Sequence, residues 1–493
     1  LNTNFNNTSI SLIDIQYFTN LESQKLFKNT ASSEKVILNG TLEGDASNLN
    51  FTNIVASVPA IIDAKLNGNV QHLLDMDRLA FDLNIEKLKT SSVKLGKILE
   101  ANTIPEELDA FGNISLVGKF KGDLKSFQIS NMNLGTSAKT SAQLSGTVKN
   151  VMDPDKLLLD VNIQEVKTHL DDIKGFIEGD LPPSLKDAGA IGYTGAFKGT
   201  LSDFDLDGNL TTDIGNAKTD VALNFSSDYK DASYDGEISL EDFNLGSVLN
   251  NEDFGNVSLN IKSKGSGLDF DNIDNQLNAK FSSLVYKDID YQNFEFNGYI
   301  SKKVVNGDFN IDNPNAKAEF TGMLDLSKEQ PDMNFQLNVD TLQLKPMNIT
   351  AEDISFSGKT KVVGEGKSLD EFIGFIQIDN LNVSIDSISY HTDSLVCSSI
   401  IDGESQKKIK FHTDGIDADI LGDFTLSQLP IYINNVVDQY IPVAWISEQT
   451  DEEGKMLDDP QIFRAELQIE DEKLLHLFLP DLQEMKNFQL KAR

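Results

Sequence analysis

One passage of this 493-residue chain occurs twice, and the duplication limits the possible fold more than any other feature. The copies run through Lys89-Thr90, Ile104-Pro105 and Gly118-Lys119-Phe120-Lys121-Gly122, and through Lys167-Thr168, Leu181-Pro182 and Gly195-Ala196-Phe197-Lys198-Gly199. The three anchors are offset by 168 − 90 = 78, 182 − 105 = 77 and 195 − 118 = 77 residues. Repeated units stack on their neighbours, so the sequence predicts a repeat protein in which one long surface matters more than one pocket.

Apolar and polar residues alternate along most of the chain. Phe81-Asp82-Leu83-Asn84-Ile85 and Phe335-Gln336-Leu337-Asn338-Val339 are two of many such segments. This period of two predicts strands with one buried and one solvated face. Turn-type dipeptides separate the segments and predict antiparallel hairpins. They are Asn39-Gly40, Asp207-Gly208, Asn297-Gly298, Asn306-Gly307, Asp402-Gly403 and Asp414-Gly415. We therefore expect a mostly-β chain, an elongated repetitive antiparallel sheet of about 30 strands with a few short helices.

Helical patterns are few and recur at one place in the repeat. Residues Ser92 to Glu100 and His169 to Glu178 are the best candidates, and each precedes a proline-containing element that would end a helix. Phe243–Leu249 is a third candidate, and Leu369–Phe372 is a weaker fourth one.

No low-complexity linker interrupts the pattern, so we expect residues 1–493 to form one continuous repetitive segment. Repeat-like units are expected at approximately 80–155, 156–235, 236–340 and 341–465, with residues 466–493 starting a truncated further repeat. Leu474–Leu482 restates the helix and Leu-Pro element without the glycine motif that should follow. This pattern predicts an internal segment of a longer protein.

The charge and composition exclude several classes of function. The net charge is −35, and arginine occurs only three times, so nucleic-acid binding is not expected. The same acidity disfavours electrostatic docking on anionic lipid headgroups. No apolar run reaches the ~18 residues of a transmembrane helix. The single cysteine, Cys397, permits no internal disulfide and is interpreted as a small core residue.

The residues that could carry chemistry form no convincing site. The five histidines have no metal-ligand spacing. Asp203–Gly208 matches the opening of a calcium-binding loop, but the twelfth position is Ile214 instead of glutamate, so a strand is the better interpretation. We therefore predict no catalytic, cofactor or metal site, and we do not expect an enzyme.

The order of elements resembles a known family. An alternating strand, a short helix, a Leu-Pro or Ile-Pro with leucine three residues after the proline, and Gly-x-Phe-Lys-Gly follow one another mainly within residues 80–265. This order resembles the large TamB proteins (translocation and assembly module, AsmA-like superfamily) of Bacteroidetes-type bacteria. The resemblance implies a sheet curled into a β-taco-like groove with an apolar interior, and an internal periplasmic segment whose inner-membrane anchor and outer-membrane contact lie outside it.

The same resemblance implies a function and partners. The segment would carry phospholipid towards the outer membrane, without a cofactor, and an outer-membrane barrel protein would bind a region outside this chain. Alternatives are a scaffold for assembling outer-membrane proteins and a structural or adhesive β-repeat protein at the cell surface. A dry core formed by two apolar faces also remains open. Three Asp-Ser/Thr-apolar triplets, starting at Asp340, Asp386 and Asp393, look like O-glycan acceptors of such bacteria.

The alternating segments supply the candidate groove residues, which share an inward-facing apolar side chain in the lipid interpretation. They are Phe81, Leu83, Ile85, Val221, Leu223, Phe225, Leu259, Ile261, Phe294, Phe296, Phe335, Leu337 and Val339.

Overall fold

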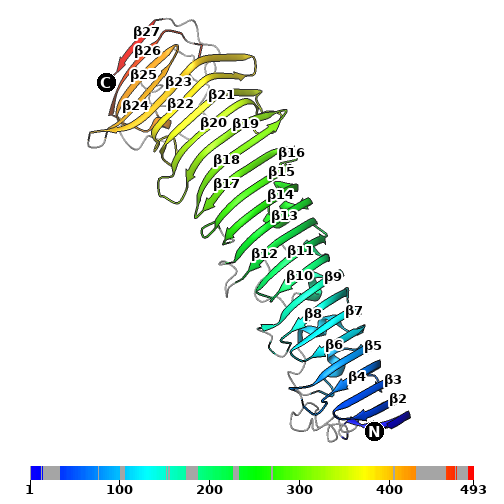
Figure 1. Ribbon diagram of the computed structural model, residues 1–493. Helices are drawn as coiled ribbons and strands as arrows, with labels where there is room; N and C mark the ends of the chain where they lie inside the picture. The colour runs from blue at the N-terminus through cyan, green and yellow to red at the C-terminus, as the bar shows by residue number, and fades with distance from the viewer. Residues whose placement is uncertain are drawn as a thin grey trace. The chain divides into compact units, whose positions relative to one another are not determined.

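The computed structural model describes residues 2–12, 14, 34–75, 77–99, 106–151, 153, 156–173, 187–225, 232–267, 270–403, 406–428, 462–471, 473–474 and 487–492. Over these residues the chain is mostly β, and 27 antiparallel strands form one open sheet with a few short helical segments (Figure 1). The expected antiparallel repetitive sheet is therefore confirmed. By its internal contacts the chain divides into two compact units, Leu1–Lys264 and Gly265–Arg493.

The first unit is a meander in which each strand from β1 to β13 pairs with the next one along the chain. Its strands are β1 Asn2–Ser11, β2 Lys35–Asp45, β3 Asn48–Val58, β4 Ile62–Gln71, β5 Ala80–Thr90, β6 Ile114–Asp123, β7 Ser126–Thr136, β8 Ser141–Lys149, β9 Leu158–His169, β10 Ala190–Gly199, β11 Asp203–Thr212, β12 Gly215–Asn224 and β13 Ser233–Asn244. A further strand, β14 Phe254–Ser266, reaches the boundary between the units.

Short helices interrupt this meander at regular intervals. They are α2 Ser92–Leu95, the 3-10 helix η3 Glu106–Phe111, α3 Leu170–Ile173 and α4 Leu245–Leu249. Helices α2, α3 and α4 follow β5, β9 and β13, so the duplicated 77-residue offset corresponds to four strands and one helical connection. Strands four apart in a meander run in the same direction, and these helices therefore lie at one edge of the unit, here called the helical edge. The opposite edge, where β6 and β10 end in tight turns, is called the hairpin edge.

The helices differ in detail from the sequence expectations. Helix α2 begins where predicted, with the Ser91 side chain capping it by accepting from the amide of Lys94, but it ends at Leu95 before the cap residue Gly96. Helix α4 confirms the third candidate. The fourth, Leu369–Phe372, is wrong: these residues form a turn between strands. The Ile104-Pro105 and Leu181-Pro182 anchors, and most of Leu474–Leu482, lie outside the described residues.

The second unit contains β15 Asp274–Tyr286, β16 Ile289–Tyr291, β17 Phe294–Ser301, β18 Val304–Asn313, β19 Ala316–Asp325, β20 Asp332–Gln343, β21 Ile354–Glu365, β22 Ile373–Ile385, β23 Ile388–Asp402, β24 Gln406–Thr413, β25 Ile416–Asp423, the 3-10 helix η8 Leu426–Gln428, β26 Ile462–Ile469 and β27 Phe488–Ala492. It is again an antiparallel meander, with β16 forming a short hairpin extension on β15.

Asparagines with positive φ bend the strands at β-bulges. Asn7 and Asn53 adopt φ of 51° and 49° at register shifts of β1 and β3. The freed amide of Asn7 donates to Asn39 Oδ1 at 2.7 Å, and that of Asn53 donates to Asn67 Oδ1 at 2.6 Å. Gly40 lies opposite the bulge at Asn53, where a Cβ would come within 2.5 Å of the Asn53 carbonyl oxygen. Bulges and strand glycines of this kind curve a sheet.

Four predicted turns are wrong because their glycines allow a close approach of strands within the sheet, at a bulge in the case of Gly40. Asn39-Gly40, Asp207-Gly208, Asn297-Gly298 and Asn306-Gly307 all lie inside strands, whereas Asp402-Gly403 and Asp414-Gly415 lie at hairpin turns. At Gly208 a Cβ would come within 2.5 Å of Tyr193 Oη, so this glycine makes room for a neighbouring ring. The same small residues that permit tight turns also permit close packing within a sheet.

Within the described residues, no helix is long and apolar enough to cross a membrane.

Candidate functional site

The candidate groove residues lie on β5, β12, β14, β17 and β20, except Phe225, which directly follows β12. Their partners on adjacent strands are mostly apolar or glycine. Phe296 lies opposite Phe309, Leu337 lies opposite Phe320, and Phe335 lies opposite Gly322. Each unit therefore has one face on which such side chains collect. This surface is called the apolar face of that unit.

Aromatic rings form ladders across the strands of each apolar face. In the first unit, Phe197 stacks on Phe204 with ring centroids 4.9 Å apart, and Phe204 lies 6.1 Å from Phe225. In the second unit, Phe281 stacks on Phe294 at 4.2 Å. Phe197, Phe204 and Phe281 were not among the predicted residues. Phe204 alternates with aspartates in β11, so the period of two that found the others also contained this information.

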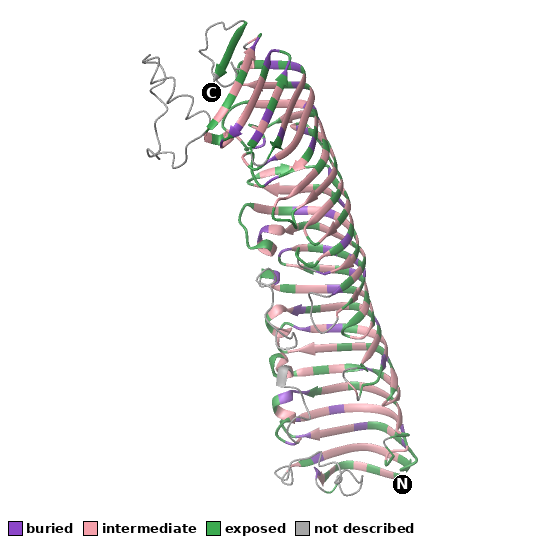
Figure 2. Cartoon of the chain, turned by 90° about the vertical axis from the view of Figure 1, so that its left-hand side faces the viewer, coloured by how far each residue is buried: buried purple, intermediate pink, exposed green. Residues whose placement is uncertain are grey.

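The apolar faces are not closed into a continuous buried core. Among the candidates, Val221, Leu259, Phe294 and Val339 are buried, and the other nine are half-buried. Figure 2 shows the same along the strands, where half-buried and exposed residues greatly outnumber buried ones. Clusters of mutually packed buried residues occur in the described residues around Val58, Leu381 and Ile409. Elsewhere on the apolar faces the apolar side chains remain partly accessible to solvent.

The opposite face of the sheet is solvated and carries ion pairs. Lys121 Nζ lies 2.8 Å from Asp82 Oδ2, and Lys264 Nζ lies 2.7 Å from Asp235 Oδ2, with all four side chains exposed. The hydrogen bond that Lys121 donates to Asp82 raises the pKa of Lys121. Exposed pairs of this kind add little stability, so their main effect is to keep a large surface soluble.

Two hollows in the described part of the surface are lined mainly by polar residues. One, of about 630 Å³, is at the helical edge of the first unit and is lined mainly by polar side chains such as Asp63, Lys94 and Ser137. A second, of about 470 Å³, lies on the polar face of the second unit, and Leu337 is the one candidate groove residue in its lining.

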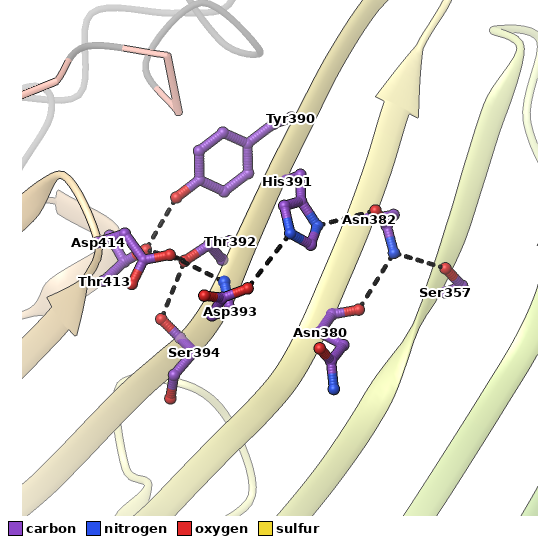
Figure 3. A network of polar contacts seen from close by, with 10 residues as sticks. All are labelled: Ser357, Asn380, Asn382, Tyr390, His391, Thr392, Asp393, Ser394, Thr413 and Asp414. Carbon is purple, nitrogen blue, oxygen red and sulfur yellow. Dashed lines mark hydrogen bonds and ion pairs between the residues drawn. The ribbon is translucent and has the colours of Figure 1, made fainter.

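A polar network in the second unit has a structural role (Figure 3). Thr392 Oγ1 lies 2.9 Å from Thr413 Oγ1 and donates to Asp414 Oδ2 at 2.8 Å, and Tyr390 Oη lies 2.8 Å from Thr413 Oγ1. Asp414 Oδ2 also accepts from the amide of Asp393, which starts one of the Asp-Ser/Thr-apolar triplets. These hydrogen bonds lower the pKa of Asp414.

The second copy of the Lys-Thr anchor, Lys167-Thr168, takes part in the same arrangement in the first unit. Thr168 Oγ1 lies 2.7 Å from Thr140 Oγ1, which donates to Asp172 Oδ2 at 2.9 Å. Asp172 Oδ2 also accepts from the amide of Lys139. A Thr-Thr-Asp group thus satisfies backbone amides at strand ends in both units, whereas the other copy of the anchor threonine, Thr90, donates to the carbonyl oxygen of Ile61 at 3.0 Å.

In the second unit, hydrogen bonds join the β21–β22 turn to the segment that follows β25. Asp370, in the β21–β22 turn, accepts from the amide of Ser427 at 2.8 Å and from its hydroxyl at 2.7 Å. Lys407 Nζ donates to the carbonyl oxygen of Asp370 at 2.5 Å. Lys407 is only 8% exposed, and burial lowers its pKa. This contact is called the Asp370 clasp.

The other sequence-predicted features have plain structural roles. Asp203–Gly208 lies in β11, with its aspartates exposed and Phe204 and Leu206 on the apolar face. Cys397 is half-buried beside Ile409, and burial raises its thiol pKa. No group of histidine, cysteine or carboxylate side chains among the described residues could hold a metal ion.

The fold and the apolar faces together define a long antiparallel β-repeat with one solvated side and one incompletely covered apolar side. Comparison with protein-family models, with curated proteins and with solved structures found no match for this chain.

Proposed function

We propose that this chain is a periplasmic segment of an envelope-spanning bridge, of the TamB kind, that carries phospholipid acyl chains along its apolar faces towards the outer membrane. The observation that supports this most is the half-buried state of the apolar faces. A folded protein usually buries such side chains, or covers them with a partner or ligand. The headgroup would stay in water beside the sheet. The membrane anchor and the outer-membrane barrel partner would belong to parts outside this chain.

The energetics favour such a role for a continuous apolar surface. Exposing an acyl chain to water costs about 0.8 kcal/mol per methylene, or roughly 12 kcal/mol for a tail of about 16 carbons. An apolar surface that extends from strand to strand removes most of that barrier without a hydrolysable cofactor. Aromatic ladders such as Phe281–Phe294 provide broad contacts that need no specific hydrogen bond.

A photo-crosslinking residue at Phe335 tests this proposal in native envelopes. Gln336 is the matched control, because it follows Phe335 on β20 and points to the opposite, solvated face. We expect phospholipid adducts at position 335 and none at position 336. Protein adducts alone at position 335 would instead favour the assembly scaffold, in which sheet edges or faces receive other chains.

A further inference from the structure

Several hairpin turns share one design that the fold itself does not require. In four of them an apolar residue lies at the tip of the turn. The side-chain oxygen of the residue just before it accepts a hydrogen bond from a backbone amide of the same turn. Asp123 accepts from the amides of Lys125 and Ser126 at 2.8 and 2.7 Å, Thr200 from Asp203 at 3.0 Å, Asp325 from Ser327 at 3.0 Å, and Ser368 from Glu371 at 3.3 Å. The tip residues, here called the tip leucines, are Leu124, Leu201, Leu326 and Leu369.

Three of the four tip leucines project into solvent. Leu201 is 67% exposed, Leu326 46% and Leu369 72%, whereas Leu124 is half-buried. The β2–β3 turn closes in the same way, with Asp45 Oδ1 accepting from the amide of Ser47, and its tip residue is Ala46. Since this turn closes with an alanine at its tip, the turn design itself does not require a leucine at that position.

Three of the tip leucines, Leu124, Leu201 and Leu369, lie three residues before a phenylalanine. In the first unit the turns of Leu124 and Leu201 both lie at the hairpin edge, because β6 and β10 run in the same direction. Three residues after each leucine comes a phenylalanine of the apolar face, Phe127 or Phe204, which lies opposite a glycine of the duplicated motif. In the second unit Leu369 likewise precedes Phe372, which is buried.

The spacing of the tips indicates the shape of their ligand. Leu326 and Leu369 follow β19 and β21, so their turns are two strands, or about 9.6 Å, apart, whereas Leu124 and Leu201 follow β6 and β10, four strands or about 19 Å apart. Isolated leucines at this spacing form no contiguous patch, whereas protein interfaces depend on a packed central cluster. A thin, flexible apolar chain lying across the strands can contact successive tips and the apolar face together.

We propose that the tip leucines form an apolar rim that covers the outer side of a lipid acyl chain held on the apolar face. This inference rests on the proposed function and adds a second contact surface to it. The rim would let an acyl chain slide from one tip to the next, because each contact is small and lacks directional bonds.

Photo-crosslinking of the full chain with vesicles of a zwitterionic phospholipid separates this inference from the proposed function. The probe is placed at Leu201, at Phe204 on the apolar face, or at Asp205 on the solvated face. We expect lipid adducts at positions 201 and 204 and none at 205. Adducts at 204 without 201 would overturn the rim alone, and a lack of adducts at both would overturn the rim and the proposed function. Protein adducts at 201 would also overturn the rim.

Substitution gives an independent measurement. We expect the double variant Leu124→Ser and Leu201→Ser to fold normally and to retain about tenfold less phospholipid after dilution, because two apolar contacts are lost. The single variant Ala46→Leu, which adds a tip leucine to an existing turn, should retain at least as much lipid as the unchanged protein. Equal retention by the double variant and the unchanged protein would refute the rim.

Discussion

Replacing Gly199 with alanine should destabilise the β10–β11 hairpin strongly although the change adds one methyl group. Gly199 adopts φ of +139°, and an added Cβ would come within 2.2 Å of the Asp203 carbonyl oxygen and 2.6 Å of Phe204 Cα. A non-glycine residue in such backbone geometry costs about 1–3 kcal/mol, and relief of the clash adds about 1 kcal/mol or more. The expected total is about 2–4 kcal/mol.

Amide hydrogen exchange measures this effect locally. A loss of 2–4 kcal/mol speeds exchange roughly 30- to 900-fold if exchange proceeds through opening of the hairpin. The increase should be centred on β10 and β11 and fade within neighbouring strands, because repeat proteins are stabilised mainly by adjacent units.

Lys198→Ala is the matched control, since Lys198 neighbours Gly199 in β10 and is exposed. Its exchange should change by less than about threefold. If Gly199→Ala exchanged as slowly as this control, the close approach of Phe204 to Gly199 would not determine the hairpin's stability.

Three further predictions concern the second unit. Asp370→Ala should speed exchange of the Ser427 amide by at least about tenfold, because both hydrogen bonds from Ser427 to the Asp370 carboxylate are lost, and unchanged exchange would contradict the clasp. The pKa of Asp414 is lowered in the folded protein, so the stabilisation by its carboxylate is present above the unfolded pKa near 4 and is lost as pH falls through the folded pKa. Exchange of the Asp393 amide, corrected for its intrinsic pH dependence, should therefore increase as pH falls through the folded pKa. Asp414→Asn should abolish this pH response. Leu337→Glu should lower phospholipid transfer by about tenfold or more by placing a carboxylate on the apolar face, and equal loss in a variant with glutamate at Asn338, the next residue of β20, would refute this reasoning.

The repeat and the strands could be predicted from the sequence because both follow from local periodicity. The offset between Gly118 and Gly195 becomes the four-strand spacing of β6 and β10, and the alternation in residues 335–339 becomes a strand with one apolar side. Side chains one residue apart must point to opposite faces of a strand, so this information is already present in a few neighbouring residues.

The bends and the cross-strand contacts could not be predicted because they depend on partners distant in sequence. Asn39-Gly40 has the composition of a turn, yet it lies in β2. The Asn39 side chain accepts a hydrogen bond from the amide of Asn7 in the bulge of β1, and Gly40 has no Cβ that would clash with the carbonyl oxygen of Asn53 in the bulge of β3. The Asp370 clasp joins residues 57 positions apart and leaves no local pattern. The tip leucines were visible in sequence, but their exposure became meaningful only once the turns and edges were placed.

The most direct test of the account is a cross-section of the protein purified with its native lipids, obtained by electron cryo-microscopy. The account predicts extended, chain-like density lying across the strands on the apolar faces, in contact with the aromatic ladder of Phe281 and Phe294. Interdigitated side chains with no density between them, forming a dry core from one end of a face to the other, would contradict it.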